Sequence, residues 1–387
     1  MQYNKLRFAI RSTAAAAILG VAGQANAVDL NIGDVDAELY GYARLNAAYD
    51  IDENINEFGT QAGQFNSVDT SSGDTAAGFF DADAEQSRLG VNVTHSSGVK
   101  VNLETDFRGG TFRIRHAYGE YGNWLAGRTW SNFNSFVGYT STLDFDSLAG
   151  NAGVQDRAAQ VRYTTGPVSF SLEDPRFQRI GASEGTTIVA AGDKKQSLPV
   201  ATARFQQSIS SAVTVSFAGL VQQLSVDNGT DDDSALGFGA FAAARLALSD
   251  MISIQGALNY TNGANGYLYR SGNGGFGAQD AYLNGNDLET LAGYGGTLGM
   301  GVNLGAGNSV NVGYGFATVD WDDAEDDLGA AVVADRHETN SNLFLNYKMT
   351  PVENVMVGVE YGYFMVDEVG GDDGDANRIL FAAQYDF

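Results

Sequence analysis

The feature that most constrains the fold is a regular alternation of polar and apolar side chains between residues 99 and 121. Over residues 99–107 the odd positions are Val, Val, Leu, Thr and Phe, whereas the even positions are Lys, Asn, Glu and Asp. After a Gly-Gly turn at 109–110 the alternation resumes. Successive side chains of a strand point to opposite faces, so this segment predicts a tight β-hairpin with one apolar and one charged face. In a soluble sandwich the apolar face would meet a core, whereas in a membrane barrel it would meet lipid and the charges would line a lumen.

The first 27 residues indicate export. They contain the basic residues Lys5, Arg7 and Arg11, a run of small and apolar residues over 12–23, and an Ala-Asn-Ala pattern at 25–27. This arrangement is typical of a secretory signal peptide, which does not belong to the fold. An N-terminal membrane anchor is disfavoured, because the apolar run is much shorter than the ~20 residues that a spanning helix needs.

The composition favours a closed barrel and excludes several other classes. The chain has 49 Gly, 4 Pro, 18 Tyr, 22 Phe and no Cys, and its formal net charge is −25. So acidic a chain is unsuited to bind nucleic acid, and without Cys it can form neither a disulfide nor a thiolate metal site. Frequent glycine and abundant aromatic residues fit a barrel whose apolar band lies between aromatic girdles.

The same alternation recurs along the chain and predicts sixteen strands. They span residues 38–49, 84–95, 98–107, 111–121, 124–130, 157–165, 167–174, 198–209, 212–225, 234–248, 251–262, 288–304, 307–320, 336–349, 353–366 and 376–387. Apart from the tight turn at 108–110, short turns alternate with long connections rich in Asp, Gly, Asn and Ser. An outer-membrane barrel has this pattern, because its short turns and its long loops lie at opposite rims. We therefore expect an all-β fold, a transmembrane antiparallel up-and-down β-barrel that occupies 38–387 as one domain, after a short periplasmic segment at 28–37.

The last expected strand supplies a second indication. Residues 376–387 alternate in character, and the final residue is Phe387. An amphipathic last strand that ends in Phe resembles the signal read by the barrel-assembly machinery of Gram-negative outer membranes. With the signal peptide, it predicts a protein of the cell outer membrane that contacts lipid and lipopolysaccharide.

The basic residues of the expected strands fall on the polar parity. An arginine facing lipid at mid-depth would cost about 2–4 kcal/mol, so these side chains are expected to line the lumen. They include Arg44, Arg88, Arg113, Arg115, Arg128 and Arg162. His116 is an exception, because it shares the parity of Ile114; either it packs in a subunit interface or the parity slips there. The acidic residues gather in the long connections, where they form a solvated surface or, alternatively, bind divalent cations.

The connection at 131–156 is too apolar for a loop surrounded by water. It contains six large apolar side chains: Phe133, Phe136, Tyr139, Leu143, Phe145 and Leu148. We expect it to fold into the barrel as a constriction loop, with Asp144 and Asp146 facing the wall that carries Arg113 and Arg115. Acids and arginines opposed across a constriction would create a transverse field that orients dipolar solutes. The alternative is a surface loop that packs on the rim.

Three segments carry a resemblance to a known family. They read ADAEQSRLGVNV (82–93), FRIRHAYGEYGNWLAGRTWSNF (112–133) and RAAQVRYTTGPVSFSLEDP (157–175). These segments resemble the DcaP-like family of trimeric outer-membrane porins, and the C-terminal half agrees with that family in strand pattern and length. The resemblance implies a sixteen-stranded homotrimer that favours small anionic solutes such as dicarboxylates, with the six lumen arginines guiding the anions. Some relatives carry a longer helical segment before the barrel, and with only residues 28–37 there we expect no periplasmic coiled coil.

The leading functional interpretation is a passive channel for small anions that needs no cofactor. Its arginines would replace water around carboxylates through bidentate contacts. One alternative is a general diffusion porin with little charge preference, and another is a surface receptor or adhesin whose acidic loops are the functional part. An enzyme is disfavoured, because His95, His116 and His337 lie in no G-x-S-x-G or H-E-x-x-H motif, and no metal site is expected.

Overall fold

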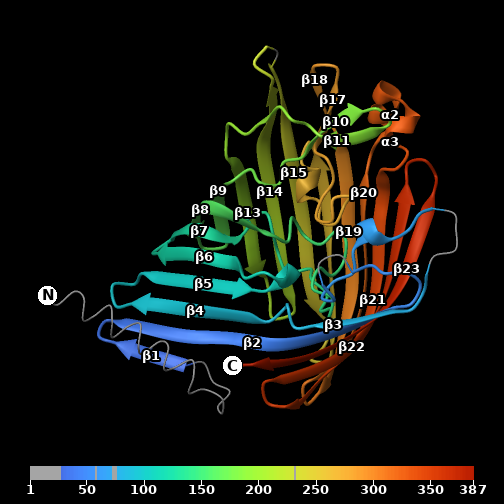
Figure 1. Cartoon of the computed structure of the whole chain (residues 1–387). Helices are drawn as coiled ribbons and strands as arrows, with labels where there is room; N and C mark the ends of the chain where they lie inside the picture. The colour runs from blue at the N-terminus through green and yellow to red at the C-terminus, as the bar shows by residue number, and fades with distance from the viewer. Residues whose placement is uncertain (1–27, 57–58, 72–75, 231) are drawn as a thin grey trace.

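The computed structural model describes residues 28–56, 59–71, 76–230 and 232–387, most of which lie in the strands of a closed antiparallel barrel (Figure 1). The sixteen strands of the ring are β2 (Val35–Asp50), β4 (Arg88–His95), β5 (Lys100–Asp106), β6 (Arg113–Tyr121), β7 (Trp124–Trp130), β8 (Arg157–Thr165), β9 (Val168–Glu173), β13 (Val200–Ser208), β14 (Val213–Asp227), β15 (Asp232–Ala247), β16 (Ile252–Asn262), β19 (Ala292–Gly305), β20 (Asn308–Val319), β21 (His337–Val352), β22 (Val355–Glu368) and β23 (Asp373–Asp386). Each strand pairs with the next, and β23 returns to β2 in the register Tyr42↔Asp386 to Asp50↔Arg378. The predicted fold class is confirmed.

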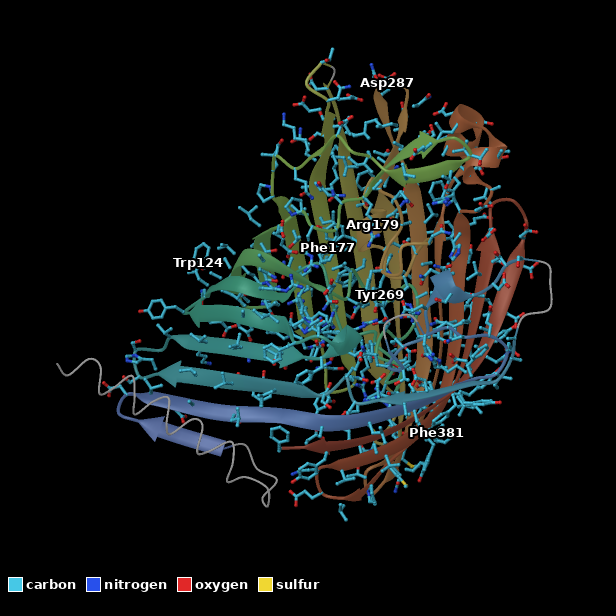
Figure 2. All side chains as sticks on the ribbon, in the orientation of Figure 1. Trp124, Phe177, Arg179, Tyr269, Asp287 and Phe381 are labelled. Carbon is cyan, nitrogen blue, oxygen red and sulfur yellow. The ribbon has the colours of Figure 1, made fainter. Side chains whose placement is uncertain are left out.

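The alternating side chains separate an apolar outer surface from a polar interior. In β16, for example, Leu258 is 69% exposed, whereas its neighbour Asn259 is 6% exposed. Figure 2 shows Trp124 and Phe381 at the outer surface and Tyr269 within the barrel. The outer surface of a barrel with this pattern suits lipid, because the strands pair around a closed ring. Among the described residues, no helix is both long and apolar enough to cross a membrane.

The remaining elements extend the ring or form a cap at the rim of the long connections (Figure 1). The extensions are β1 (Val28–Ile32) on β2, β3 (Phe79–Asp83) on β2, and β12 (Lys194–Lys195) on β14. The cap contains a four-stranded sheet and two short helices: β10 (Ile180–Glu184), β11 (Thr187–Ala190), β17 (Ala281–Asn284), β18 (Asp287–Thr290), α2 (Asp322–Leu328) and α3 (Ala330–Val333). Three 3₁₀ turns complete the structure: η1 (Phe65–Ser67), η2 (Arg108–Gly110) and η3 (Asn265–Tyr267).

The observed bounds agree closely with the expected ones, with three differences. Strands expected at 124–130 and 157–165 have those bounds. The strand expected at 84–95 begins only at Arg88, as β4, because residues 84–87 form a turn in which the Ser87 N–H donates to the Ala84 carbonyl, and β3 precedes that turn. The segment expected at 288–304 is interrupted at Leu291, because the N–H and carbonyl of that residue bond to other connections.

The N-terminal region is the third difference. The first barrel strand begins at Val35 instead of residue 38, and residues 28–32 form the additional strand β1. The signal peptide expected at residues 1–27 lies outside the described residues.

The acidic connection between β20 and β21 also differs from the irregular loop that its composition suggests. Residues 322–328 form α2, with three acidic residues in the first turn, where the helix dipole favours negative charge. Trp321, directly before α2, and Val333, the last residue of α3, are both buried in one apolar cluster with Tyr282 of the cap. The apolar residues that flank the acids therefore fix this connection in place.

Candidate functional site

The connection 131–156 lies inside the barrel, as its apolar composition predicts. At its start the Ser131 hydroxyl donates to Glu173 of β9 at 2.7 Å. At its tip the Leu143 N–H donates to Glu360 of β22 at 2.7 Å. Because β9 and β22 are the seventh and fifteenth strands of the ring, they belong to opposite walls, and the loop crosses the interior between them.

Close packing holds the loop against the strands that it passes. Phe133 packs edge-on against Phe241 of β15, with ring centroids 5.1 Å apart. Gly138 approaches β16 so closely that a Cβ atom there would lie 2.2 Å from the carbonyl oxygen of Gly256, so a larger side chain would push the loop away. The loop is therefore fixed along its length and not only at its tip.

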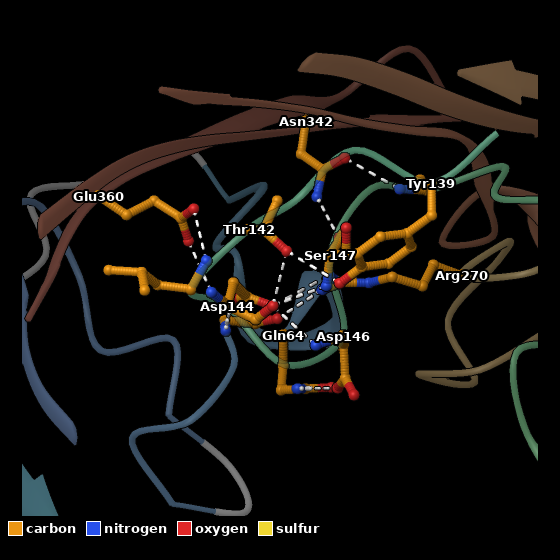
Figure 3. A network of polar contacts seen from close by, with 12 residues as sticks. Gln64, Tyr139, Thr142, Asp144, Asp146, Ser147, Arg270, Asn342 and Glu360 are labelled. Carbon is orange, nitrogen blue, oxygen red and sulfur yellow. Dashed lines mark hydrogen bonds and ion pairs between the residues drawn. The ribbon is translucent and has the colours of Figure 1, made fainter. Parts of the chain in front are cut away.

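The tip of the loop is held by charged side chains of the wall (Figure 3). The carboxylate of Glu360 accepts the backbone N–H groups of Leu143 at 2.7 Å and of Asp144 at 2.6 Å. Arg44 of β2 donates to the Leu143 carbonyl at 2.7 Å. Bonds to ionised groups contribute more than neutral ones, so these contacts fix the position of the tip.

The two loop aspartates have other partners than the expected Arg113 and Arg115. Asp146 forms a bidentate pair with Arg108, with N–O distances of 2.7 and 2.6 Å. Burial opposes the ionisation of Asp146, but Arg108 outweighs it and lowers the pKa of that carboxyl to about 2. Asp144 lies 3.9 Å from a guanidinium nitrogen of Arg270, and burial raises its pKa. Neither aspartate therefore pairs with Arg113 or Arg115, although both border a cavity together with Arg115.

Asp144 serves mainly as an acceptor for backbone groups. Its carboxylate accepts the N–H groups of Gly63 at 2.8 Å and of Asp146 and Ser147 at 2.9 Å each (Figure 3). Gly63 belongs to the first long connection, which also packs inside the barrel through Phe65 against Phe364 of β22. The constriction loop is thus covered by a second inward segment that the sequence pattern did not predict.

The arginines of β6 are neutralised by acids of β5. Arg113 pairs with Asp106 at 2.5 and 3.0 Å. Arg115 pairs with Glu104 at 2.7 Å and with Asp106 at 2.8 Å. Two arginines and two carboxylates therefore form a compensated ion-pair cluster in the wall, and their net charge is close to zero.

A β-bulge explains the exceptional parity of His116. The register between β5 and β6 shifts after Glu104↔His116, so that Arg115 is an extra residue in β6. His116 consequently turns inward, where its Nδ1 lies 2.9 Å from the Thr129 hydroxyl and its Nε2 accepts from Arg157 at 3.3 Å. The parity does slip at this point, and the interpretation of His116 as an interface residue is wrong.

Arg44 and Arg88, which were also expected to line the lumen, have no carboxylate partner as close as those of Arg113 and Arg115. Arg44 donates to Asn46, Gln384 and the Leu143 carbonyl, all of which are neutral acceptors. The guanidinium of Arg88 lies over the rings of Tyr42 and Phe145, at 5.1 and 5.5 Å from their centroids.

The carboxylate nearest to Arg88 is that of Glu104, at 3.9 Å. This carboxylate already pairs with Arg115 at the shorter distance of 2.7 Å. The Nε of Arg88 is buried without a hydrogen-bond partner. Within the described ranges, no carboxylate oxygen lies within 4.0 Å of Arg44.

Arg162 and Arg128 occupy the two ends of the path through the barrel. Arg162 donates to Gln160 at 2.9 Å and to the Trp130 carbonyl at 2.5 Å, without a carboxylate partner among the described residues. Arg128 borders a cavity near the long connections. Its cross-strand neighbours are Ala117 and the exposed Ala159, whereas the next residue of β7, Thr129, is buried, so Arg128 has the parity of the outer face and not the lumen parity expected from the sequence.

Three cavities follow the constriction loop from one rim to the other. The central one, about 340 Å³, is bordered by Arg44, Arg88 and Arg115 of the wall and by the two loop aspartates. The upper one, about 240 Å³, lies toward the long connections and shares Arg115 with the central cavity. The lower one, about 540 Å³, lies toward the short turns and is bordered by Arg162 and Arg204. Trp130 borders both the central and the lower cavity.

Several residues of this site were missed from the sequence. Glu104 and Asp106 share the polar parity of one expected strand, so their position beside Arg113 and Arg115 could have been predicted. Arg270 could not, because it lies in a long connection without periodicity. Among the described residues, no group of three or more possible ligands could hold a metal ion.

Comparisons with known proteins place this geometry in a family. A family model described as DcaP outer membrane protein matches residues 24–387. The crystal structure of the outer membrane channel DcaP of Acinetobacter baumannii superposes with a TM-score of 0.75 and 27% identity, covering 92% of this chain and 99% of that one. No curated protein matches the chain.

More distant structures share the fold alone. The anion-selective porin from Comamonas acidovorans has a TM-score of 0.56 at 13% identity, covering 91% of this chain and all of that one. OmpT of Vibrio cholerae in its trimer form has a TM-score of 0.54 at 12% identity, covering 91% and 99%. The sixteen-stranded architecture is thus common to channels with little sequence in common.

Proposed function

The chain belongs to the DcaP outer membrane protein family, and from that premise we propose that it conducts small anions, dicarboxylates among them, by passive diffusion guided by arginines. It is an outer-membrane channel with the porin fold, and its family and structural neighbours are channels. The proposal concerns what passes through it and which residues set the preference.

The observation that carries the proposal is the uncompensated charge of Arg44 and Arg88 beside the constriction loop. Both border the central cavity, and neither has a carboxylate within 3.5 Å among the described residues. Two positive charges about 4 Å from a passing anion each contribute about 1 kcal/mol even in water, and more where the wall excludes it. The overall charge of −25 does not oppose this, because the local field of the lumen and not the net charge governs permeation.

The shape of the central cavity supports small solutes with two charged ends. Arg44 and Arg88 belong to neighbouring strands on one wall, while the opposite side of the cavity is formed by the loop with Leu143 and Phe145. Planar guanidinium groups match carboxylates through two parallel bonds. A short dicarboxylate could therefore engage one arginine with each end as it passes the loop.

We also propose that the functional unit is a homotrimer. The structure of OmpT from Vibrio cholerae is described in a trimer form, and the resemblance to trimeric porins points in the same direction. Mass measurement of the detergent-solubilised protein would test this, and a monomeric mass would contradict it.

A planar-bilayer experiment tests the proposed selectivity. The reversal potential across a KCl gradient should have the sign of chloride preference for the wild type. An Arg44→Gln/Arg88→Gln double variant should lower the chloride-to-potassium permeability ratio by about 25-fold, since about 1 kcal/mol per charge corresponds to about fivefold for each arginine. A wild type with little preference would favour a general diffusion porin, and a potassium preference would assign control of the pore to the acids.

A further inference from the structure

Three connections that lie far apart in the sequence meet inside the barrel at one side chain, that of Arg270. They are residues 59–71 of the first long connection, the constriction loop 131–156, and residues 263–280 between β16 and β17. Arg270 belongs to the third of them and is 1% exposed. Figure 3 shows its side chain extending toward Ser147 and Asp144. The ion pairs of the wall described above do not involve this arginine.

The guanidinium of Arg270 joins the other two segments to each other. Its Nη1 donates to the Ser147 carbonyl of the constriction loop at 2.6 Å, and its Nη2 donates to the Gly63 carbonyl at 2.5 Å. The same group lies over the ring of Phe65, 4.5 Å from the centroid. The planar fork of an arginine can hold two acceptors in fixed directions. One side chain therefore sets where the first connection lies relative to the constriction loop.

The backbone that carries Arg270 is attached to the barrel wall. The side-chain amide of Asn340 in β21 donates to the carbonyls of Arg270 and Gly272 at 2.8 and 2.9 Å. The Tyr269 carbonyl accepts the N–H of Gly150 at 2.9 Å. Because the base of the side chain is fixed in this way, release of the guanidinium would free residues 59–71 and the constriction loop and leave the connection 263–280 in place.

The backbone is also strained on both sides of this junction. Arg270 has a φ of +62° and Ser147 a φ of +57°, in the left-handed region that side chains other than glycine rarely adopt. The Nε of Arg270 is buried without a hydrogen-bond partner among the described residues. Such strain persists only where surrounding contacts enforce it, and it gathers at clamps and switch regions. Glycine would adopt this φ without the cost, so what arginine contributes at position 270 is its side chain.

The junction lies directly behind the path through the barrel. Tyr269, the neighbour of Arg270, borders the central cavity, and Phe276 of the same connection borders the upper cavity. Asp144 also borders the central cavity, and its carboxylate accepts the Gly63 N–H at 2.8 Å. A displacement of the segments that Arg270 holds would therefore change the cross-section of the path.

We propose that Arg270 is a positioning residue that sets the width of the conducting path, because it holds residues 59–71 and the constriction loop together in their inward positions. When the guanidinium releases the carbonyls of Gly63 and Ser147, the two segments separate and the channel widens. The proposal concerns width and not charge preference, so it does not depend on the anion selectivity proposed above.

Single-channel conductance in planar bilayers tests this role. Arg270→Gly removes both hydrogen bonds and relieves the left-handed strain. Since conduction depends on pore diameter, its conductance should exceed that of the wild type by about twofold or more. Arg336→Gly is the matched control, because Arg336 also lies outside the strands and donates to a carbonyl, that of Ile188 in the cap, and it does not border the three cavities. Equal conductances for Arg270→Gly, Arg336→Gly and the wild type would overturn the proposal.

A thiol-labelling experiment follows the first connection itself. The chain has no Cys, so a single Ala62→Cys substitution, at a residue that is 1% exposed, reports when residues 59–71 leave the interior. A charged methanethiosulfonate reagent should modify this thiol slowly in the otherwise wild-type channel and about tenfold faster or more when Arg270→Gly is added, since labelling of a buried group requires local opening. Equal labelling rates would show that the segment stays in place without Arg270 and would contradict the proposal.

A second variant keeps the test decisive if Arg270→Gly does not fold. Phe65→Ala weakens the same junction from the first connection, where Phe65 packs on Arg270 and on Phe364, and it should raise the conductance as well. Heat-modifiable electrophoretic mobility shows which variants are folded. Folded variants that unfold at lower urea concentration but keep the wild-type conductance would assign Arg270 a structural role alone and overturn the proposal. A failed reversal-potential experiment, by contrast, would remove the proposed selectivity and leave the conductance result unaffected.

Discussion

The arginines of β6 and the arginines beside the constriction loop have the same chemistry, but only those of β6 are paired with close carboxylates. Arg113 and Arg115 share two carboxylates of β5 at distances of 3.0 Å or less. Arg44 donates to neutral oxygens, and the nearest carboxylate to Arg88 is 3.9 Å away. Side-chain parity shows which residues reach the lumen, but only their partners show which of them contribute to its field.

The two groups also differ in what they do for the protein. Within the β6 cluster the side chains of Arg115 and Asp106 are only 1% and 2% exposed, and the charges of the cluster hold β5 and β6 together. Arg44 and Arg88 border a cavity without a close carboxylate, and Arg44 also holds the loop tip through the Leu143 carbonyl. The first group is therefore expected to respond to mutation in stability and the second in selectivity.

The largest expected effect comes from breaking the compensated cluster. Asp106→Asn leaves two arginines without their shared carboxylate, and breaking a buried ion pair costs about 3–5 kcal/mol. Urea unfolding in phospholipid vesicles, followed by tryptophan fluorescence, would measure the loss. Asp373→Asn, at an exposed acid of β23, is the control and should change the stability by less than about 0.5 kcal/mol. Equal losses for the two variants would show that the cluster does not stabilise the wall.

The second prediction concerns a variant that weakens the attachment of the constriction loop, which brings solutes close to Arg44. Glu360→Gln replaces one of two acceptor oxygens with a donor that faces the amides of Leu143 and Asp144, and a bond to a charged group is worth about 1.5–3 kcal/mol. We expect frequent closing events and higher current noise in single-channel recordings. Glu338→Gln, at an exposed glutamate of β21, should leave the recordings unchanged. Identical traces for the two variants would mean that packing alone holds the loop.

The same contrast separates what could be predicted from the sequence from what could not. The wall was predictable because a strand exposed to lipid on one face and water on the other must alternate, and β7 and β8 have the expected bounds. The prediction failed where the backbone departs from that period, as at the bulge that turns His116 inward. A single extra residue leaves no mark in the composition.

The interior was predictable only in part. The apolar side chains of 131–156 predicted that this connection enters the barrel, and its contacts with Glu173 and Glu360 confirm it. The partners of its aspartates were not predictable, because Arg108 lies in a turn and Arg270 in a connection more than a hundred residues away. Contacts between irregular segments depend on the closed barrel that brings them together, and no periodicity encodes them.

The third prediction replaces Arg88 by a residue that has the same charge but a different side-chain shape. Arg88→Lys preserves one positive charge beside the central cavity but removes the planar fork and its stacking on Tyr42 and Phe145. The chloride-to-potassium permeability ratio should stay within about twofold, while the block of chloride current by succinate should weaken severalfold. Current recordings with succinate added to the chamber facing the long connections would measure both. If the block is unchanged, charge alone guides the dicarboxylate.

The smallest effect on the permeability ratio is expected from Arg113, which the sequence pattern places in the lumen as it does Arg88. Arg113→Gln leaves Asp106 paired with Arg115 alone, so the cluster then carries one excess negative charge. The Arg113 side chain is 40% exposed, however, so solvent screens a charge at this position. The permeability ratio should therefore change by less than about twofold, against about 25-fold for the Arg44/Arg88 pair. A change in the Arg113→Gln channel as large as that of the pair would show that solvent does not screen a charge at this position, and that every arginine of the lumen contributes to a field that falls with its distance from the solute.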